Sequence, residues 1–470
     1  MMCSRHRGIS SWNSRATMHS WGRLAYGILL LVAAANSMPD FSGLPPGPYC
    51  AGRYPPGECC PGRRDECSAP IVNTICYCDD FCDRFREEDC CPDFYSHCKG
   101  IEANVTLPPP PPPAEIRSCY FQRKYYNASQ TFKINCNICK CSTVGRTAEV
   151  LCEQNRCLQE PDLINEINSN SWSSSLGPLG WRARNYSEFW GRTLKEGVQL
   201  RLGTLNPSRS VYKMNSVRRI YDPATLPREF DARTRWPREI SGVEDQGWCG
   251  ASWAISTARV ASDRFAVMSM GAESVLLSAQ HLLSCNNRGQ QGCSGGYLDR
   301  AWMYLRRFGL VEENCYPWRG MDEQCKLRKR TNLKIAGCVP ASANPLRTEL
   351  YKVGPAYRLG NETDIMQEIL TSGPVQATMR VYQDFFSYES GVYKHSATAE
   401  LYETGYHSVR IIGWGEDEQP RFNRVSPLKY WLVVNSWGRE WGEDGLFRIE
   451  RGTNECEIES FVLGVWAKTV

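Results

Sequence analysis

The chain has 470 residues, a net charge of +4 and 24 cysteines. Its length allows about three domains, and the small net charge gives no reason to expect a nucleic-acid partner. Most of the cysteines precede residue 158. That density is typical of disulfide-stapled extracellular modules and is foreign to a reducing cytosol.

The N-terminus has the features of a secretory signal peptide, which we predict for residues 1–37. Basic residues precede the apolar run from Leu24 to Ala35, and small residues follow up to Ser37. This run is too short to cross a bilayer, and no later stretch reaches the roughly 18 apolar residues that a membrane helix needs. We therefore expect a secreted protein of the extracellular space or matrix, with no membrane span.

Residues 50–98 hold a dense group of cysteines. A stretch of about fifty residues buries too little apolar surface to fold alone, so disulfides must add roughly 2 to 4 kcal/mol each. The run from Cys76 to Cys98 resembles a somatomedin B domain, a small binding module of extracellular proteins. Zinc is the alternative for closely spaced cysteines, but the even count and the single nearby histidine, His97, favour disulfides. We expect neither metal nor cofactor, and disulfides at Cys50, Cys59, Cys60, Cys67, Cys76, Cys78, Cys82, Cys90, Cys91 and Cys98.

Two further segments precede the longest domain. A proline run from Pro108 to Pro113 predicts a stiff, extended linker over residues 108–118. Beyond it, residues 119–157 carry six cysteines, and the centre from Cys136 to Cys141 resembles the first part of a von Willebrand factor type C module. A short disulfide-linked β-hairpin spacer without a ligand is the alternative.

Cysteine is absent from residues 158–225, which form a polar, loosely helical stretch. Four Asn-X-Ser/Thr sequons along the chain support the secretory route, because this sequence accepts N-linked glycans. They are Asn104, Asn127, Asn185 and Asn361.

From residue 226 onward, helices come first and antiparallel strands later. Apolar residues from Ala254 to Phe265 recur at helical spacing and predict a helix that begins at Ser252. A second helix is predicted from Leu298 to Phe308. Strands are predicted at His407–Ile412, Tyr430–Val434, Leu446–Glu450 and Phe461–Trp466. This order is typical of an α+β fold; the family resemblance described below implies two lobes with a cleft between them.

The stretch from Gln246 to Trp253 contains the most informative motif. Papain and the cathepsins carry C-G-[SA]-C-[WY] around a nucleophilic cysteine, with a histidine and an asparagine far downstream. Here Ser252 stands at the nucleophile position. Gln246, His407 and Asn435 stand where a papain-like enzyme keeps its oxyanion-hole amide, its base and the residue that orients the base. The alternative is a serine that caps a helix, with an unrelated histidine and asparagine.

A serine at this position cannot simply replace the thiol. In papain the pKa of the cysteine is lowered to about 3 to 4, so the ion pair with histidine exists before substrate arrives and an asparagine suffices as orienter. A hydroxyl must lose its proton during the reaction, and the resulting imidazolium then needs a carboxylate. In serine proteases an asparagine in place of that carboxylate lowers turnover roughly 10⁴-fold, about 5 kcal/mol of barrier. We therefore expect a vestigial site without an active catalytic residue.

Residues 226–470 resemble cathepsin B through further motifs, among them Gly292-Cys-Ser-Gly-Gly296, Gly373-Pro-Val375, Gly391-Val-Tyr393 and Asn454-Glu-Cys456. The resemblance implies a papain-like, cathepsin B-like fold, preceded in residues 158–225 by a propeptide that we expect to stay attached. It also implies the disulfides Cys249–Cys293, Cys315–Cys325 and Cys285–Cys338, with Cys456 as a buried free thiol. An intermolecular link is the alternative for Cys456. Cathepsin B binds the substrate carboxylate with two histidines of its occluding loop, and no histidine lies between Cys315 and Cys325.

The order of modules, with serine in place of the cysteine, resembles the tubulointerstitial nephritis antigen family. This resemblance implies a secreted, non-catalytic glycoprotein of basement membranes that engages laminin, type IV collagen and integrins. A weak Ser-dependent peptide hydrolase or a peptide-trapping pseudoprotease is the alternative function. The basic run from Lys326 to Arg330 suggests heparan sulfate as a further partner, although a solvated loop or a processing site fits it as well.

Overall fold

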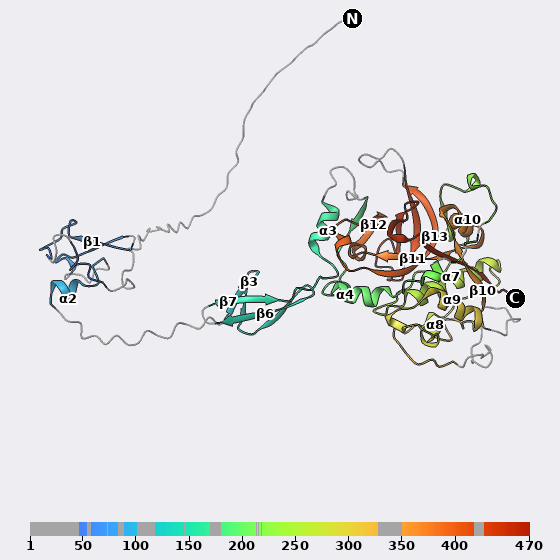
Figure 1. Cartoon of the computed structure of the whole chain (residues 1–470), viewed down its shortest axis with the longest axis horizontal. Coiled ribbons are helices and arrows are strands. Elements are labelled where there is room, and N and C mark those ends of the chain that lie inside the picture. Colours follow the sequence, from blue (N-terminus) through green and yellow to red (C-terminus); the bar gives the residue numbers. More distant parts are fainter. Residues whose placement is uncertain are drawn as a thin grey trace, which may run out of the picture. The chain divides into compact units, whose positions relative to one another are not determined.

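A computed structural model describes residues 47–53, 58–72, 74–82, 89–100, 118–144, 147–169, 180–212, 214, 216–217, 219–327, 350–417 and 427–470. The chain divides into two compact units, residues 1–113 and 114–470 (Figure 1). The predicted signal peptide, the proline run and Asn104 lie outside the described residues. Within the described ranges, none of the helices has both the length and the apolar character required to cross a bilayer.

The first unit is a small module whose interior consists mainly of cystine. The strands β1 (Ser68–Ile71) and β2 (Thr74–Tyr77) form an antiparallel pair, and the short helix α2 (Phe94–Cys98) follows. Its core comprises half-cystines with little more than Phe94 and Ile71 as apolar side chains. All ten cysteines that the sequence placed in disulfides are paired, as Cys50–Cys78, Cys59–Cys98, Cys60–Cys67, Cys76–Cys91 and Cys82–Cys90.

The second unit begins with a strand-rich module. Its strands form a two-stranded and a three-stranded antiparallel sheet, made of β3 (Ser118–Phe121), β4 (Lys124–Asn127), β5 (Thr131–Ile134), β6 (Asn137–Val144) and β7 (Thr147–Cys152). Three disulfides close it, namely Cys119–Cys141, Cys136–Cys157 and Cys139–Cys152.

The cysteine-free stretch contains short helices and one strand that the sequence did not predict. Helix α3 (Pro161–Asn168) starts with proline at its first turn and buries Leu163 and Ile167. The strand β8 (Trp181–Ala183) follows, and Thr193 and Glu196 form a capping box at the start of α4 (Leu194–Gly197). The chain then continues as the π-helix η1 (Val198–Leu202), α5 (Arg209–Tyr212) and η2 (Pro223–Thr225).

One lobe of the following domain is helical. The long helix α7 (Ser252–Met268) packs on α8 (Ala279–Cys285) and α9 (Leu298–Arg307). These helices, with smaller contributions from β10 and β16, enclose one of the two large hydrophobic cores. Both predicted helices are confirmed, and Phe308 forms the C-cap of α9.

The other lobe is built on a long sheet. Its strands run in the order β10-β16-β11-β13-β14-β15-β12-β8, and β9 (Phe230–Asp231) pairs with β13. Along the sequence, shorter helical segments separate these strands. They are α6 (Ala232–Arg235), η3 (Gly292–Ser294), α10 (Glu362–Ser372), η4 (Gln383–Ser387), η5 (Ala399–Leu401) and η6 (Glu455–Glu457). The strands not yet bounded are β10 (Val353–Leu359), β11 (Val375–Val381), β12 (Tyr388–Tyr393), β13 (Gly405–Asp417), β14 (Leu428–Val434), β15 (Leu446–Glu450) and β16 (Phe461–Ala467). The last four contain the four predicted strands, so the two-lobed α+β fold is confirmed.

Helix α7 joins the lobes through buried ion pairs. Arg264 binds Glu368 of α10 at 2.6 Å, with both side chains fully buried, and Arg410 of β13 binds Asp263. A buried charge is tolerated only when an opposite charge and hydrogen bonds compensate its lost hydration. These pairs therefore fix the position of α7, and with it the residues at its N-terminus, relative to the sheet.

Two predicted disulfides, Cys315–Cys325 and Cys285–Cys338, are wrong. Cys285, the last residue of α8, is bonded to Cys325 with a Cα–Cα distance of 4.7 Å, so Cys325 is not the partner of Cys315. The reason is that the chain returns along α8, where Gln280 binds the backbone of Arg319 and Met321. Cys315 is also disulfide-bonded, and Cys338 lies outside the described residues. The pair Cys249–Cys293 and the buried free thiol of Cys456 are confirmed.

Candidate functional site

The fold brings the four candidate residues together between the lobes. Ser252 is the first residue of α7, and Gln246 lies in the loop before it. His407 lies on β13, and Asn435 directly follows β14. The exposed fractions of Gln246, Ser252 and His407 are 0%, and that of Asn435 is 3%. The site is therefore closed to solvent.

His407 and Asn435 form the pair that the sequence predicts. The Nε2 atom of His407 lies 2.7 Å from Oδ1 of Asn435, which also accepts a hydrogen bond from the backbone N–H of Ser436. Trp437 packs on the imidazole with ring centres 5.2 Å apart. Burial lowers the pKa of His407 to about 4 despite the hydrogen bond to Asn435. The imidazole is neutral at physiological pH.

The hydroxyl of Ser252 forms its hydrogen bonds with residues other than His407. Its hydroxyl lies 3.0 Å from Oγ1 of Thr204, and it accepts a hydrogen bond of 3.3 Å from the backbone N–H of Ser408. Among the described residues no hydrogen bond joins Ser252 to His407, whose hydrogen-bond partners, the side chain of Asn435 and the backbone of Leu202, oppose the lowering of its pKa by burial. The serine is thus held by a threonine and a backbone amide rather than by a base.

The N-terminus of α7 offers little to this serine. The positive end of a helix lowers the pKa of a thiol and favours a thiolate. A neutral hydroxyl carries no charge for the helix end to stabilise, and its proton must go to a base. His407 makes no hydrogen bond to this hydroxyl, and that contact is the one through which a base activates a nucleophile.

Residues 202–205, which we call the interlobe segment, occupy the space beside these residues. Gln246 donates from Nε2 to the carbonyl of Leu202 at 3.3 Å and to that of Cys249 at 2.8 Å, while its Oε1 accepts from Ser436 at 2.6 Å. The side-chain amide expected to bind an oxyanion is therefore already engaged with the protein's own backbone.

The interlobe segment is bonded to both lobes. Gly203 accepts a hydrogen bond from the backbone N–H of Gly296, and Leu205 donates back to the carbonyl of Gly296. On the other side, Thr204 donates from its backbone N–H to the carbonyl of Tyr406 on β13 at 3.0 Å. An extended stretch bonded in this way occupies the position that a bound peptide would need.

Glycine is required at position 203. Its φ angle is +102°, and a Cβ atom there would lie 1.9 Å from the carbonyl oxygen of Gly250. Only glycine adopts this conformation without strain and also permits such a close backbone approach. Sequence reasoning did not find Leu202, Gly203 or Thr204, because a Gly-Thr pair in a polar stretch carries no distinguishing signal.

Buried anchors hold the chain upstream of the interlobe segment. Arg201 has no exposed surface, and its guanidinium binds Glu188 at 2.8 Å and the carbonyl of Gly247 at 2.8 Å. Burial lowers the pKa of Arg201, and Glu188 opposes that shift. Strand β8 extends the sheet by pairing with β12. The segment therefore forms part of the folded domain rather than a loose tail.

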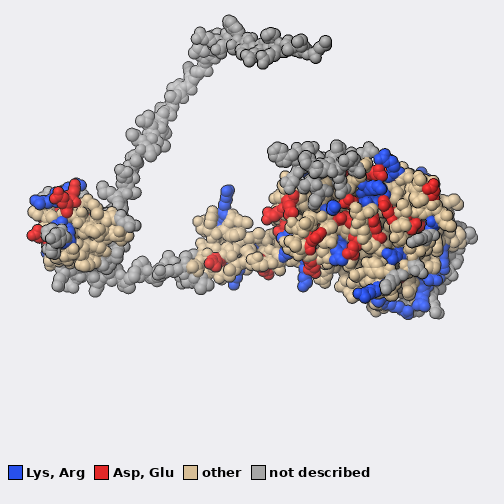
Figure 2. Space-filling view, turned by 45° about the horizontal axis from the view of Figure 1, so that its top comes forward, with Lys and Arg blue, Asp and Glu red and all other residues tan. Residues whose placement is uncertain are grey.

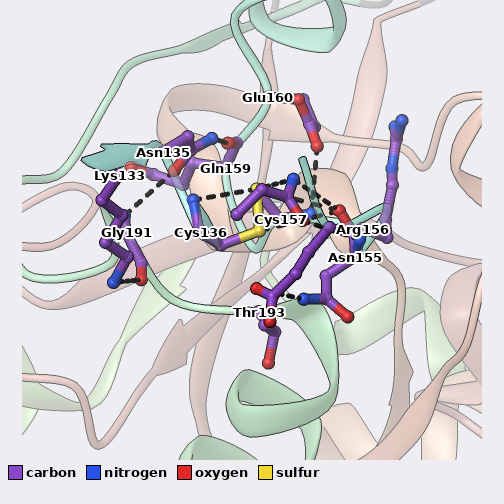
Figure 3. Close-up of a disulfide and its surroundings, with 12 residues drawn as sticks. Lys133, Asn135, Cys136, Asn155, Arg156, Cys157, Gln159, Glu160, Gly191 and Thr193 are labelled. Carbon is purple, nitrogen blue, oxygen red and sulfur yellow. Dashed lines mark hydrogen bonds between the residues drawn. A yellow bond between two sulfur atoms is a disulfide. The ribbon is translucent and has the colours of Figure 1, made fainter. Parts of the chain in front are cut away.

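A disulfide connects the strand-rich module to residues 157–205, the stretch that ends in the interlobe segment (Figure 3). Cys136 is bonded to Cys157, and Asn135 donates to the carbonyl of Gln159 at 2.7 Å and accepts from the N–H of Gly191 at 3.0 Å. Lys133 adds a hydrogen bond of 2.8 Å to the carbonyl of Gly191. This disulfide and these hydrogen bonds therefore hold the strand-rich module against residues 157–205.

Comparison with known proteins identifies the family. The sequence profile described as "Papain family cysteine protease" matches residues 226–466. The human protein named tubulointerstitial nephritis antigen-like is 44% identical over 438 residues, covering 89% of each chain. The chain belongs to the tubulointerstitial nephritis antigen family, whose papain-like domain it shares. The bovine tubulointerstitial nephritis antigen is 39% identical over 447 residues, covering 90% of this chain and 87% of the relative.

Peptidases and their precursors match a shorter part. A cathepsin B-like cysteine proteinase of Caenorhabditis elegans is 40% identical over 262 residues, which is 51% of this chain and 75% of the relative. The solved structure of procathepsin B S9 from Trypanosoma congolense has a TM-score of 0.53 and 28% identity, and covers 66% of this chain and 99% of its own. That match is longer than residues 226–466, so it extends into the stretch that precedes the papain-like domain.

The three described sequon asparagines Asn127, Asn185 and Asn361 are exposed. Asn361 also caps α10, because its Oδ1 accepts from the backbone N–H of Asp364 at 2.7 Å. An N-linked glycan is carried on Nδ2, so the cap leaves the attachment atom free for modification.

Proposed function

We propose that this protein is a secreted, non-catalytic peptidase C1 homologue that acts as an extracellular matrix and basement membrane glycoprotein in cell adhesion. The observation that supports it best is Ser252, buried and hydrogen-bonded to Thr204 at the position of a papain-type nucleophile. Three obstacles to peptide cleavage coincide here. The nucleophile is a hydroxyl, the nearby imidazole is a weak base that is bound to an amide and not to that hydroxyl, and the interlobe segment fills the peptide's place.

In this proposal the papain-like domain serves as a rigid binding surface. Laminin, type IV collagen and integrins are the partners that the family implies. Disulfide-closed modules and exposed sequon asparagines suit a protein that acts outside the cell, and localisation to the matrix rests on the same features.

A basic cavity on the helical lobe suits an anionic partner such as heparan sulfate. Its volume is about 280 Å³, and among the described residues only Asp299 contributes a carboxylate to its wall. The lining residues are Asn286, Arg288, Asp299, Arg300, Met303, Tyr304, Arg307 and Phe308. Figure 2 shows Lys and Arg side chains gathered along the lower edge of the larger unit. Guanidinium groups bind planar anions through paired hydrogen bonds, and the aromatic rings provide a face for a sugar ring. Of the basic run from Lys326 to Arg330, the last three residues lie outside the described part.

The test of the non-catalytic role uses four forms of the full-length secreted protein: wild type, Ser252→Cys, Gly203→Ala and the double variant. Each is given a broad cathepsin substrate and a thiol-reactive active-site probe. We expect no turnover from the wild type or from Gly203→Ala alone, and the highest turnover and labelling from the double variant. Wild-type turnover that is lost in both Ser252→Ala and His407→Ala would overturn the proposal in favour of the weak Ser-dependent hydrolase.

Matrix binding is tested on immobilised laminin, type IV collagen and heparan sulfate, and with integrin-bearing cells. For heparan sulfate, the double variant Arg288→Ala/Arg307→Ala is compared with Arg238→Ala, an exposed arginine outside the cavity. We expect the double variant to bind more weakly and with a smaller dependence on salt, and Arg238→Ala to bind as the wild type does. A protein that binds none of these materials contradicts the proposed function.

A further inference from the structure

A cluster of three metal-ligand side chains lies outside the vestigial site. His395 follows β12, and Glu455 and Cys456 belong to η6, about sixty residues away along the chain. The ligand atoms of these residues all lie within 4.8 Å of one another. The other such group among the described residues, Cys50, Cys78 and Cys91, consists of half-cystines and offers no free thiolate.

The three side chains converge on one carboxylate oxygen. Oε1 of Glu455 lies 2.5 Å from Nδ1 of His395 and 3.4 Å from Sγ of Cys456, and it also accepts from the backbone N–H of His395 at 3.0 Å. Ligands of a tetrahedral zinc ion lie about 2.0 to 2.3 Å from the metal, which places them roughly 3 to 4 Å apart. A small outward movement of the imidazole makes room for an ion in place of the protons on Nδ1 and Sγ.

A second carboxylate orients the histidine. Nε2 of His395 lies 2.7 Å from Oε1 of Glu400, and the ring stacks on Tyr382 with centres 4.4 Å apart and an interplanar angle of 12°. A histidine that binds a metal almost always gives its other ring N–H to such an acceptor, which fixes the tautomer and directs the free nitrogen at the ion. Glu400 is such an acceptor for Nε2 of His395, and it thereby leaves Nδ1 directed at Glu455 and Cys456.

The thiol is unusual for this protein. Cys456 is 5% exposed and free, whereas every other cysteine in the described ranges is disulfide-bonded. The side chain of His395 keeps 19% exposure, so this member of the cluster is reachable from solvent. Asp384 accepts a hydrogen bond of 2.6 Å from the backbone N–H of Ser396, next to His395, and adds a further carboxylate to this region.

We propose that His395, Glu455 and Cys456 bind a zinc ion, with Glu400 as the residue that positions the histidine. The set of one nitrogen, one oxygen and one sulfur donor matches zinc, which accepts all three, better than the hard cations calcium and magnesium. Three protein ligands leave the fourth position for water or for a side chain of a bound partner. The ion connects the chain after β12 to η6, and the assignment does not depend on the proposed matrix function.

The test uses the full-length secreted protein, freed of metal by a chelator and titrated with Zn²⁺ in a calorimeter. We compare the wild type with Cys456→Ser, His395→Gln and Glu400→Gln, and with His97→Gln as a control because His97 is an exposed histidine of the first unit. We expect one zinc ion per chain, at least tenfold weaker binding in the two ligand variants, 10- to 100-fold weaker binding in Glu400→Gln, and no change in His97→Gln. Absence of zinc binding by the wild type, or equal binding by Cys456→Ser and His97→Gln, would overturn the proposal.

Two measurements on the wild-type chain keep the test decisive if Cys456→Ser does not fold. With Co²⁺ in place of zinc, a thiolate-to-cobalt charge-transfer band is expected, and its absence refutes the involvement of Cys456. Zinc should also slow alkylation of the Cys456 thiol at least tenfold under mild unfolding conditions. An alkylation rate that zinc leaves unchanged contradicts the site.

Discussion

Two histidines of the sheet lobe, His407 and His395, lie in opposite electrostatic surroundings. His407 is fully buried beside the amide of Asn435, and its pKa is lowered to about 4. His395 is partly exposed between the carboxylates of Glu455 and Glu400, and its hydrogen bond to Glu455 is the main cause that raises its pKa to about 9. The histidine of the candidate site therefore remains uncharged at neutral pH, while His395 carries a charge when no metal is bound. The identity of the neighbour, amide or carboxylate, together with burial, decides the difference.

The largest test of this comparison gives His407 a carboxylate neighbour. In Asn435→Asp the new charge lies next to Nε2, so we expect the pKa of His407 to rise by about 3 units, equivalent to about 4 kcal/mol. Titration of the imidazole by NMR measures the shift. Asn286→Asp, at another buried asparagine, should leave His407 unchanged. A pKa that stays near 4 in Asn435→Asp would show that burial alone governs this residue.

A second test concerns stability against pH. Because the pKa of His407 is near 4 when folded and about 6.5 when unfolded, the unfolded state binds more protons between these values. The free energy of unfolding therefore falls as the pH drops from 7 to 4, by about 3 kcal/mol from this residue. Chemical denaturation of wild type and His407→Gln at several pH values measures it. His281, whose pKa burial also lowers to about 4, should give the same dependence through His281→Gln. Equal slopes for wild type and His407→Gln would refute the assignment.

The smallest expected effect comes from a substitution that disturbs the interlobe segment beside His407. Gly203→Ala forces a Cβ against the carbonyl of Gly250 at a φ of +102°, and we expect a loss of about 2 kcal/mol in the free energy of unfolding. Gly452→Ala is the matched control, because that glycine has a φ of +86° and its nearest neighbour is the flexible side chain of Glu362. Thermal unfolding compares them. If both variants lose the same stability, the strain of the backbone angle, and not the interlobe contact, is what costs free energy.

The regular elements of the papain-like domain were predictable because their patterns are local. Helix α7 follows from apolar residues at helical spacing, and β13 to β16 follow from short apolar runs. The candidate site was predictable because Gln246, Ser252, His407 and Asn435 stand in recognisable motifs. What could not be predicted depends on contacts between distant parts of the chain. Strand β8 exists because it pairs with β12, and Cys285 binds Cys325 because the chain folds back along α8.

The interlobe segment shows the same limit. Its place is set by Gly296 on one lobe and Tyr406 on the other, and neither residue lies near it in sequence. The hydroxyl partner of Ser252, Thr204, is likewise recognisable only once the segment lies between the lobes. The sequence predicted that serine stands in place of a nucleophile, and the structure adds which residues surround it.

The disulfide Cys136–Cys157 ties the strand-rich module to residues 157–205, but it does not tie these residues to the papain-like domain. No disulfide among the described residues joins the chain before residue 206 to the chain after residue 225. We expect that a protease cut in this connection creates a two-chain protein, in which the upstream chain stays bound through β8, Arg201 and the interlobe segment. Such a molecule migrates as two bands on a denaturing gel and as one particle on a sizing column. Fragmentation on a gel would then report a change in covalent structure rather than the release of a free fragment.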